Sequence, residues 1–183
     1  MKRKGDCMRN IILTWETVGF ALCGILSFVF HFAYEWSKKN AFVGAFTPVN
    51  ESVWEHIKII FFPYLFFSIV EFFVLKEPAL AFWGVKSIVL MLIPLTIVTL
   101  FYTYSGIWGR NFLPIDILIG YISLFVAYYY FYQFYIFHIF SNETYMLWIW
   151  IASIFTFMLI IFTYFPPKGI DIFRHLWYIL SKV

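Results

Sequence analysis

The chain has 183 residues, of which 63% are hydrophobic and 25% aromatic, while only 13% are charged. Its mean hydropathy of +0.83 means that it carries more apolar surface than one soluble core can bury. This composition excludes a soluble domain and predicts a membrane protein. The formal net charge of +3 is compatible with contacts to membrane lipids and gives no indication of nucleic-acid binding.

Apolar runs long enough to cross roughly 30 Å of hydrocarbon recur along the whole chain. The first run follows a basic N-terminal tail and reaches about Tyr34, which is too long for a cleaved signal peptide. Gly19 and Cys23 lie one turn apart within it and form a face of small residues that a second helix can approach closely. The runs and their breakers predict five transmembrane helices, near residues 11–35, 51–75, 79–104, 114–140 and 145–165.

We therefore expect one all-α membrane domain that covers residues 1–183. Residues 36–50 form the only connection with room to fold over a site. After Pro166 and Pro167, apolar residues recur at helical spacing, so residues 168–182 are predicted to form an amphipathic helix in the membrane interface. Basic residues lie at both ends of the bundle, and the basic tail before the first span favours a cytoplasmic N-terminus in the cell membrane.

Ionisable residues flank the connection at 36–50 on both sides. Charged groups within or beside a bilayer are costly, which makes such residues candidates for a functional site. If the five helices alternate in direction, the end of the first span, the start of the second and the start of the fourth share one face. That face then gathers His31, Glu35, Glu51, Glu55, His56 and Asp116.

One chemistry that fits this face is metal binding. Imidazole nitrogens and carboxylate oxygens are the ligands of divalent metals such as Zn, so His31, His56, Asp116 and Glu51 are candidate metal ligands. With Glu55 as general base, such a site favours metal-assisted hydrolysis of a lipid-like substrate. The spacing does not, however, reproduce a strong metal signature.

A second chemistry needs no metal. A carboxylate beside a histidine at an apolar boundary tunes a general acid or base towards neutral pH, so Glu55, His56 and Glu35 are candidate catalytic residues. A purely structural role is equally compatible with the pattern. Asn50 is a good N-cap for the second span, and Glu55 can form a local pair with Lys58.

A second group of ionisable residues is expected at the opposite end of the bundle. Glu16, Glu71, Lys86 and His138 fall there and can form neutralising pairs between helices. If the two groups were the ends of one route, the protein would be a small permease, but the middles of the spans are nearly all apolar. An accessory subunit of a larger assembly, with an unknown protein partner, is a further alternative.

The string Pro-Val-Asn-Glu-Ser-Val-Trp-Glu-His at residues 48–56, preceded by His-Phe-Ala-Tyr-Glu-Trp-Ser at 31–37, is highly specific. It resembles a family of small bacterial multi-pass membrane proteins that is catalogued as a domain of unknown function. The resemblance continues through Asp116 and the pair at 166–167, and the chain departs from the pattern beyond that point. It implies a membrane location and carries no activity.

A weaker similarity links the chain to the membrane-hydrolase superfamily that includes alkaline ceramidases. Ser52 and His56 match the Ser-x-x-x-His pattern of those enzymes, and Asp116 matches their membrane carboxylate. The later His-x-x-x-His pair is missing, and the chain has fewer than seven spans. We treat this similarity as an analogy for zinc-dependent lipid hydrolysis.

Overall fold

The computed structural model describes residues 2–174, and this part of the chain is entirely helical apart from its connections. Five of the helices are long and apolar enough to cross a membrane, which confirms the predicted all-α bundle. The elements are α1 (Lys2–Trp36), α2 (Ala41–Gly44), α3 (Val53–Leu75), α4 (Ala79–Trp108), α5 (Leu113–Ile136), α6 (Asn142–Tyr164) and the 3-10 helix η1 (Asp171–Phe173).

Several helix ends differ from the expected ones for local backbone reasons. The helix α1 already includes the basic tail. The helix α4 continues to Trp108, where Gly109 adopts a left-handed conformation (φ 67°) and donates a backbone hydrogen bond to the Ser105 carbonyl. The helix α5 ends early because His138 has a positive φ of 48°. Of the predicted C-terminal helix, 175–182 lie outside the described residues, and 168–174 contain only η1.

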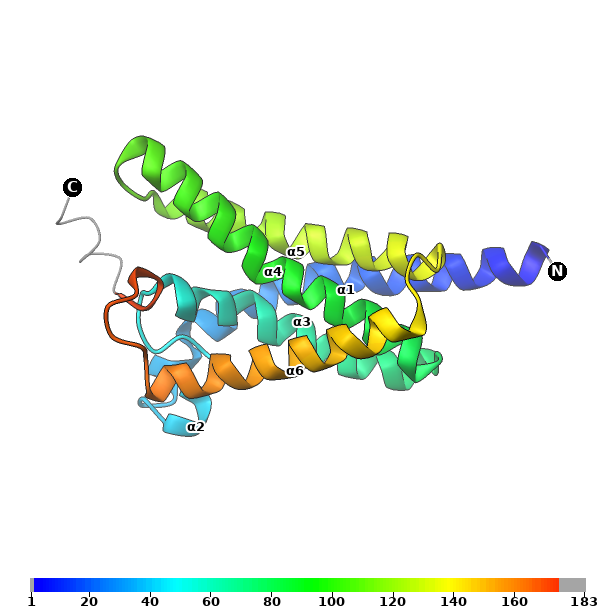
Figure 1. The fold of residues 1–183 in the computed structure, drawn as a ribbon, viewed down its shortest axis with the longest axis horizontal. Helices are drawn as coiled ribbons and strands as arrows, with labels where there is room; N and C mark the ends of the chain where they lie inside the picture. Colours follow the sequence, from blue (N-terminus) through cyan, green and yellow to red (C-terminus); the bar gives the residue numbers. More distant parts are fainter. Residues whose placement is uncertain (1, 175–183) are drawn as a thin grey trace.

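The long helices run alternately in opposite directions (Figure 1). The connection carrying α2, the α4–α5 connection and η1 lie at one end of the bundle. The N-terminus and the α3–α4 and α5–α6 connections lie at the other end. The helices α3 and α4 are the most buried, and α6 is the most exposed. This alternation brings sequence-distant polar residues to shared ends of the bundle.

Close helix contacts in the bundle depend on glycines. An added Cβ at Gly19 would lie 2.4 Å from the Phe67 ring, and one at Gly84 would lie 2.3 Å from the Tyr145 Cβ. Both separations are shorter than non-bonded atoms tolerate. Glycine at these two positions is therefore required for the close approach of α1 to α3 and α5, and of α4 to α6. The expected small-residue face of α1 is therefore a packing face.

Large apolar side chains also cover the outside of the bundle. Ile25, Phe125, Trp150 and Phe157 are each more than half exposed, on α1, α5 and α6. Exposed apolar area of this kind is a liability in water and is expected in contact with lipid tails. The outer surface is thus consistent with the membrane location that the spans indicate.

Candidate functional site

The start of α3 is fixed by two side-chain caps. The Ser52 hydroxyl accepts a hydrogen bond from the Glu55 backbone N–H at 3.3 Å, which makes Ser52 the N-cap. The expected cap, Asn50, instead accepts from the Ser52 backbone N–H at 2.9 Å through its side-chain oxygen. The prediction of Asn50 as the N-cap is wrong because the chain makes one further turn before the helix begins.

The Glu55 carboxylate lies on the side of α3 that faces α6. Its Oε2 lies 2.6 Å from Lys58 Nζ and accepts from the Val49 backbone N–H at 3.0 Å. The ammonium of Lys58 also donates to the Gly44 carbonyl at 2.8 Å and to Thr163 Oγ1 at 2.9 Å. The predicted local pair is confirmed, and the connection between α1 and α3 packs directly on it.

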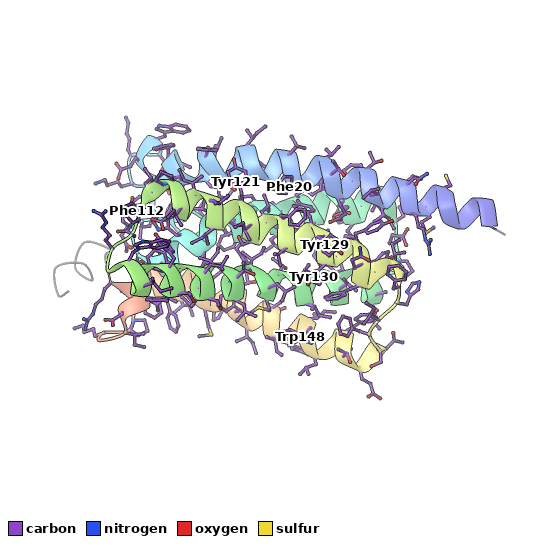
Figure 2. All side chains as sticks on the ribbon, turned by 90° about the horizontal axis from the view of Figure 1, so that it is seen from above. Phe20, Phe112, Tyr121, Tyr129, Tyr130 and Trp148 are labelled. Carbon is purple, nitrogen blue, oxygen red and sulfur yellow. The ribbon has the colours of Figure 1, made fainter. Side chains whose placement is uncertain are left out.

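A cavity of about 870 Å³ lies on another side of α3, between α1, α3, α4 and α5. The charged side chains and the histidines gather at the end of the bundle, and the lining of the deeper part is mostly apolar. Figure 2 views the bundle from the side of α5, with Phe20 and Tyr121 near the α1–α5 contact. The polar lining includes His31, Glu51, His56, Arg110, Asn111 and Asp116, and the apolar lining includes Ile60, Ile97, Phe101, Ile119 and Leu124.

His56 is held in a defined orientation at the polar end. Its Nδ1 lies 2.9 Å from the Ser52 carbonyl oxygen, which only accepts, so Nδ1 carries the proton. The other nitrogen, Nε2, lies 3.3 Å from Glu51 Oε2, and the His31 ring lies 5.9 Å away between centroids. The contact between Nε2 and Glu51 needs a hydrogen on Nε2, because an ionised carboxylate only accepts hydrogen bonds. A His56 ring that is protonated on both nitrogens therefore satisfies both contacts.

Asp116 is held in place on the opposite wall. The hydroxyl of Tyr104 donates to one of its carboxylate oxygens, and Asn111 Nδ2 donates to the other at 3.2 Å. The Tyr104 oxygen in turn accepts from the Phe112 backbone N–H at 3.2 Å. These bonds tie the α4–α5 turn to the start of α5 and fix the carboxylate beside the cavity.

The cavity unites four of the predicted site residues and leaves two outside. His31, Glu51, His56 and Asp116 all line it, whereas Glu55 is committed to Lys58. Glu35 lies on the surface, 3.8 Å from Lys39, with both side chains about two thirds exposed. The connection at 36–50 supplies no lining residue among those of the cavity and covers the Glu55–Lys58 pair instead.

Two polar lining residues, Arg110 and Asn111, are not among the predicted site residues. They belong to the short turn between α4 and α5, which looks like a simple connection in the sequence. The signal that could have found them is their position, because this turn shares an end of the bundle with Glu51 and His56.

The metal hypothesis finds no ready-made ligand set in residues 2–174. Within this range, no group of three or more His, Cys, Asp or Glu side chains is placed to hold a metal ion. The Ser-x-x-x-His analogy meets a further difficulty, because the Ser52 hydroxyl is buried and engaged in the helix cap. What the cavity offers directly is a polar end with hydrogen-bonding groups and an apolar interior.

Comparison with known protein families places the chain in one family. A family model described as a family of unknown function (DUF6512) matches residues 7–177. The chain belongs to this family. The match confirms the expected membership in a family without an assigned function. Comparisons with curated proteins and with solved structures found no match.

This DUF6512 protein has a second ionisable cluster, built from α1, α3 and α4. Lys86 Nζ lies 2.9 Å from Glu16 Oε1 and 2.7 Å from Glu71 Oε2, and all three residues are buried. The ammonium also lies 3.6 Å from the centroid of the Phe131 ring. His138 is exposed beyond the end of α5 and does not join these pairs.

Proposed function

We propose that this DUF6512 protein binds an amphiphilic molecule of the lipid class in the cavity between α1, α3, α4 and α5. The observation that carries this proposal is the separation of polar and apolar lining along one cavity. The volume of about 870 Å³ suits a sizeable ligand, since ligand pockets commonly measure about 300–1,000 Å³. The head group would lie beside His56 and Asp116, and an acyl chain beside Ile97 and Leu124.

The polar end offers groups of both signs. Arg110 and the imidazoles of His31 and His56 are donors, while Glu51 and Asp116 are acceptors. A zwitterionic head group, with a phosphate and an amine, matches such a mixed set better than a purely anionic one. The Arg110 guanidinium is the natural partner of the phosphate because it binds phosphate oxygens in pairs.

The ligand would enter from the side of the bundle. Phe28 on α1 and Leu113 and Ile117 on α5 line the cavity, and each of them is more than two fifths exposed. In the proposed function these apolar residues form the wall between the cavity and the surrounding lipid. A lipid tail can pass this apolar wall without leaving an apolar environment, so binding needs no passage through water.

We further propose that the protein resides in the cell membrane of a bacterium with its N-terminus in the cytoplasm. The basic residues before the first span support this orientation. In that orientation the cavity and the Glu55–Lys58 pair lie at the extracytoplasmic end, and the Glu16–Lys86–Glu71 cluster lies nearer the cytoplasm.

Lipid retention through purification tests the proposal. Gly120 lines the cavity, and a Cβ there is in ordinary contact with Ile60 at 3.4 Å, so Gly120→Leu places a branched side chain in the cavity. The control is Gly106→Leu on α4, where a Cβ meets nothing within 4 Å. Native mass spectrometry should show a bound phospholipid in the wild type and Gly106→Leu, and much less in Gly120→Leu. Equal retention in all three proteins would contradict a cavity site.

Hydrolysis of the bound lipid is a second candidate function. It is favoured by the fixed orientation of His56, whose Nδ1 faces the Ser52 carbonyl while Nε2 faces Glu51 at the polar end. A histidine held this way is suited to transfer a proton at a head-group ester. Lipid analysis over time should show product formation by the wild type and none by His56→Ala, with the amount of product divided by the amount of lipid that each protein binds. Unchanged lipid in wild-type samples would leave binding alone as the function.

A further inference from the structure

The cluster formed by Glu16, Glu71 and Lys86 has an uneven charge count. Two carboxyl groups contact one ammonium, and each of the three side chains is at most 4% exposed. All three residues lie within helices that are long and apolar enough to cross a membrane. If both carboxyl groups were ionised, the cluster would hold a net charge of minus one, which an apolar interior disfavours strongly.

The ammonium of Lys86 is the charged partner in this cluster. Its Nζ lies 3.6 Å from the ring centroid of Phe131, 5.0 Å from that of Tyr64 and 5.7 Å from that of Tyr128. Aromatic faces stabilise a cation, so this cage favours the protonated amine. One ionised carboxylate then neutralises the ammonium, and the second carboxyl group has no cation of its own.

The other titratable groups around the cluster are tyrosines and a cysteine, and neither side chain can carry a positive charge. They are Tyr64 on α3, Tyr128 and Tyr135 on α5 and Cys23 on α1. The Tyr128 hydroxyl donates to Cys23 Sγ at 3.1 Å. The buried Tyr64 hydroxyl has no hydrogen-bond partner within residues 2–174. The surroundings therefore leave the charge of the second carboxyl group unbalanced.

The hydrogen bonding of the two carboxyl groups indicates how the unbalanced negative charge is removed. Within the described part of the chain, Glu16 Oε2 and Glu71 Oε1 are buried without a donor. The two carboxyl groups nevertheless lie close together, because both contact the same Lys86 Nζ, at 2.9 Å and 2.7 Å. Ionised carboxylates only accept hydrogen bonds, whereas a protonated carboxyl group also donates one. A single proton would link the pair and bring the cluster to neutrality.

We propose that Glu16 and Glu71 form a proton-binding site that holds one proton in the folded protein at neutral pH. The two carboxyl groups share the proton, while Lys86 neutralises the remaining negative charge. The site differs from the Glu55–Lys58 pair, in which one carboxylate and one ammonium already balance. It is also independent of the lipid proposed for the cavity.

Infrared spectroscopy tests the site in the unmodified protein. Glutamate labelled with ¹³C on the side-chain carboxyl separates these groups from aspartates. The folded wild type at neutral pH should show the C=O stretch of a protonated carboxyl group, shifted by the label. Glu16→Gln and Glu71→Gln should each lose this band, whereas Glu55→Gln should keep it. A folded wild type without the labelled band would overturn the proposal.

Unfolding in mixed micelles of dodecyl sulfate gives a second readout. Unfolded glutamates are ionised at neutral pH, so unfolding would release the bound proton. Wild-type stability should therefore fall with rising pH, by about tenfold in the unfolding equilibrium constant per pH unit relative to Glu16→Gln or Glu71→Gln. The control is Glu35→Gln, which should keep the wild-type slope because the Glu35 side chain is about two thirds exposed. Equal slopes in all proteins, or stability that follows Na⁺ rather than pH, would overturn the proposal.

Discussion

The Glu55 carboxylate and the Lys58 ammonium lie 2.6 Å apart, and the chain between α1 and α3 closes over them. Both side chains are almost fully buried. Backbone groups from that connection complete the pair, because the Val49 N–H donates to Glu55 and the Gly44 carbonyl accepts from Lys58. The ion pair thus fixes the loop to the start of α3.

Removing one partner of this pair should strongly destabilise the fold. Lys58→Met leaves a buried carboxylate unpaired and should cost about 3–5 kcal/mol in the free energy of unfolding. The measurement is dodecyl sulfate unfolding followed by circular dichroism. The double variant Glu55→Leu, Lys58→Met should recover much of the loss, because it leaves no unpaired charge.

The exposed pair of Glu35 and Lys39 provides the control for that experiment. Its two side chains are about two thirds exposed, so Lys39→Met should change stability by less than about 1 kcal/mol. If Lys39→Met and Lys58→Met had equal effects on the free energy of unfolding, burial of the Glu55–Lys58 pair would not matter for stability.

The contact between α4 and α6 should not tolerate a methyl group at Gly84. The added Cβ would lie 2.3 Å from the Tyr145 Cβ, so Gly84→Ala must push the helices apart. We expect a loss of about 1–3 kcal/mol, as in other overpacked interiors. Gly106→Ala is the matched control, because its Cβ meets nothing within 4 Å. A wild-type unfolding midpoint for Gly84→Ala would mean that α6 packs differently.

Alternation of the helices made much of the polar arrangement predictable. Once five spans are assigned, Glu16, Glu71 and Lys86 are placed at one end of the bundle, and His31 and Asp116 are placed at the other. The sequence could not predict which way each residue points, because a helix that is apolar all around gives no signal for its rotation. Adjacent residues on a helix differ by about 100°, so Glu55 faces α6 while its neighbour His56 faces the cavity.

The hydrogen bond from Tyr104 to Asp116 should stabilise the α4–α5 turn. Tyr104→Phe removes a donor from the carboxylate and leaves Asn111 as its side-chain partner. We expect a loss of about 1 kcal/mol in the free energy of unfolding, the usual net contribution of one hydrogen bond, because Asp116 is only half-buried and keeps Asn111 as a partner. The exposed Tyr129 offers the control, since Tyr129→Phe should be neutral. Equal effects of the two changes would show that the bond to Asp116 contributes nothing.

The two ends of the cavity should respond differently to substitution. Arg110→Gln removes a cation at the polar end, whereas Gly120→Leu fills the apolar part. If the head group is zwitterionic, Arg110→Gln should weaken binding of a phospholipid roughly tenfold, the scale of one lost charged hydrogen bond. It should leave binding of a diacylglycerol unchanged, because that lipid lacks the phosphate. Gly120→Leu should weaken both lipids, since both place a chain in the apolar part. Equal weakening of both lipids by Arg110→Gln would show that the phosphate does not contact Arg110, and the head group would then have to lie elsewhere.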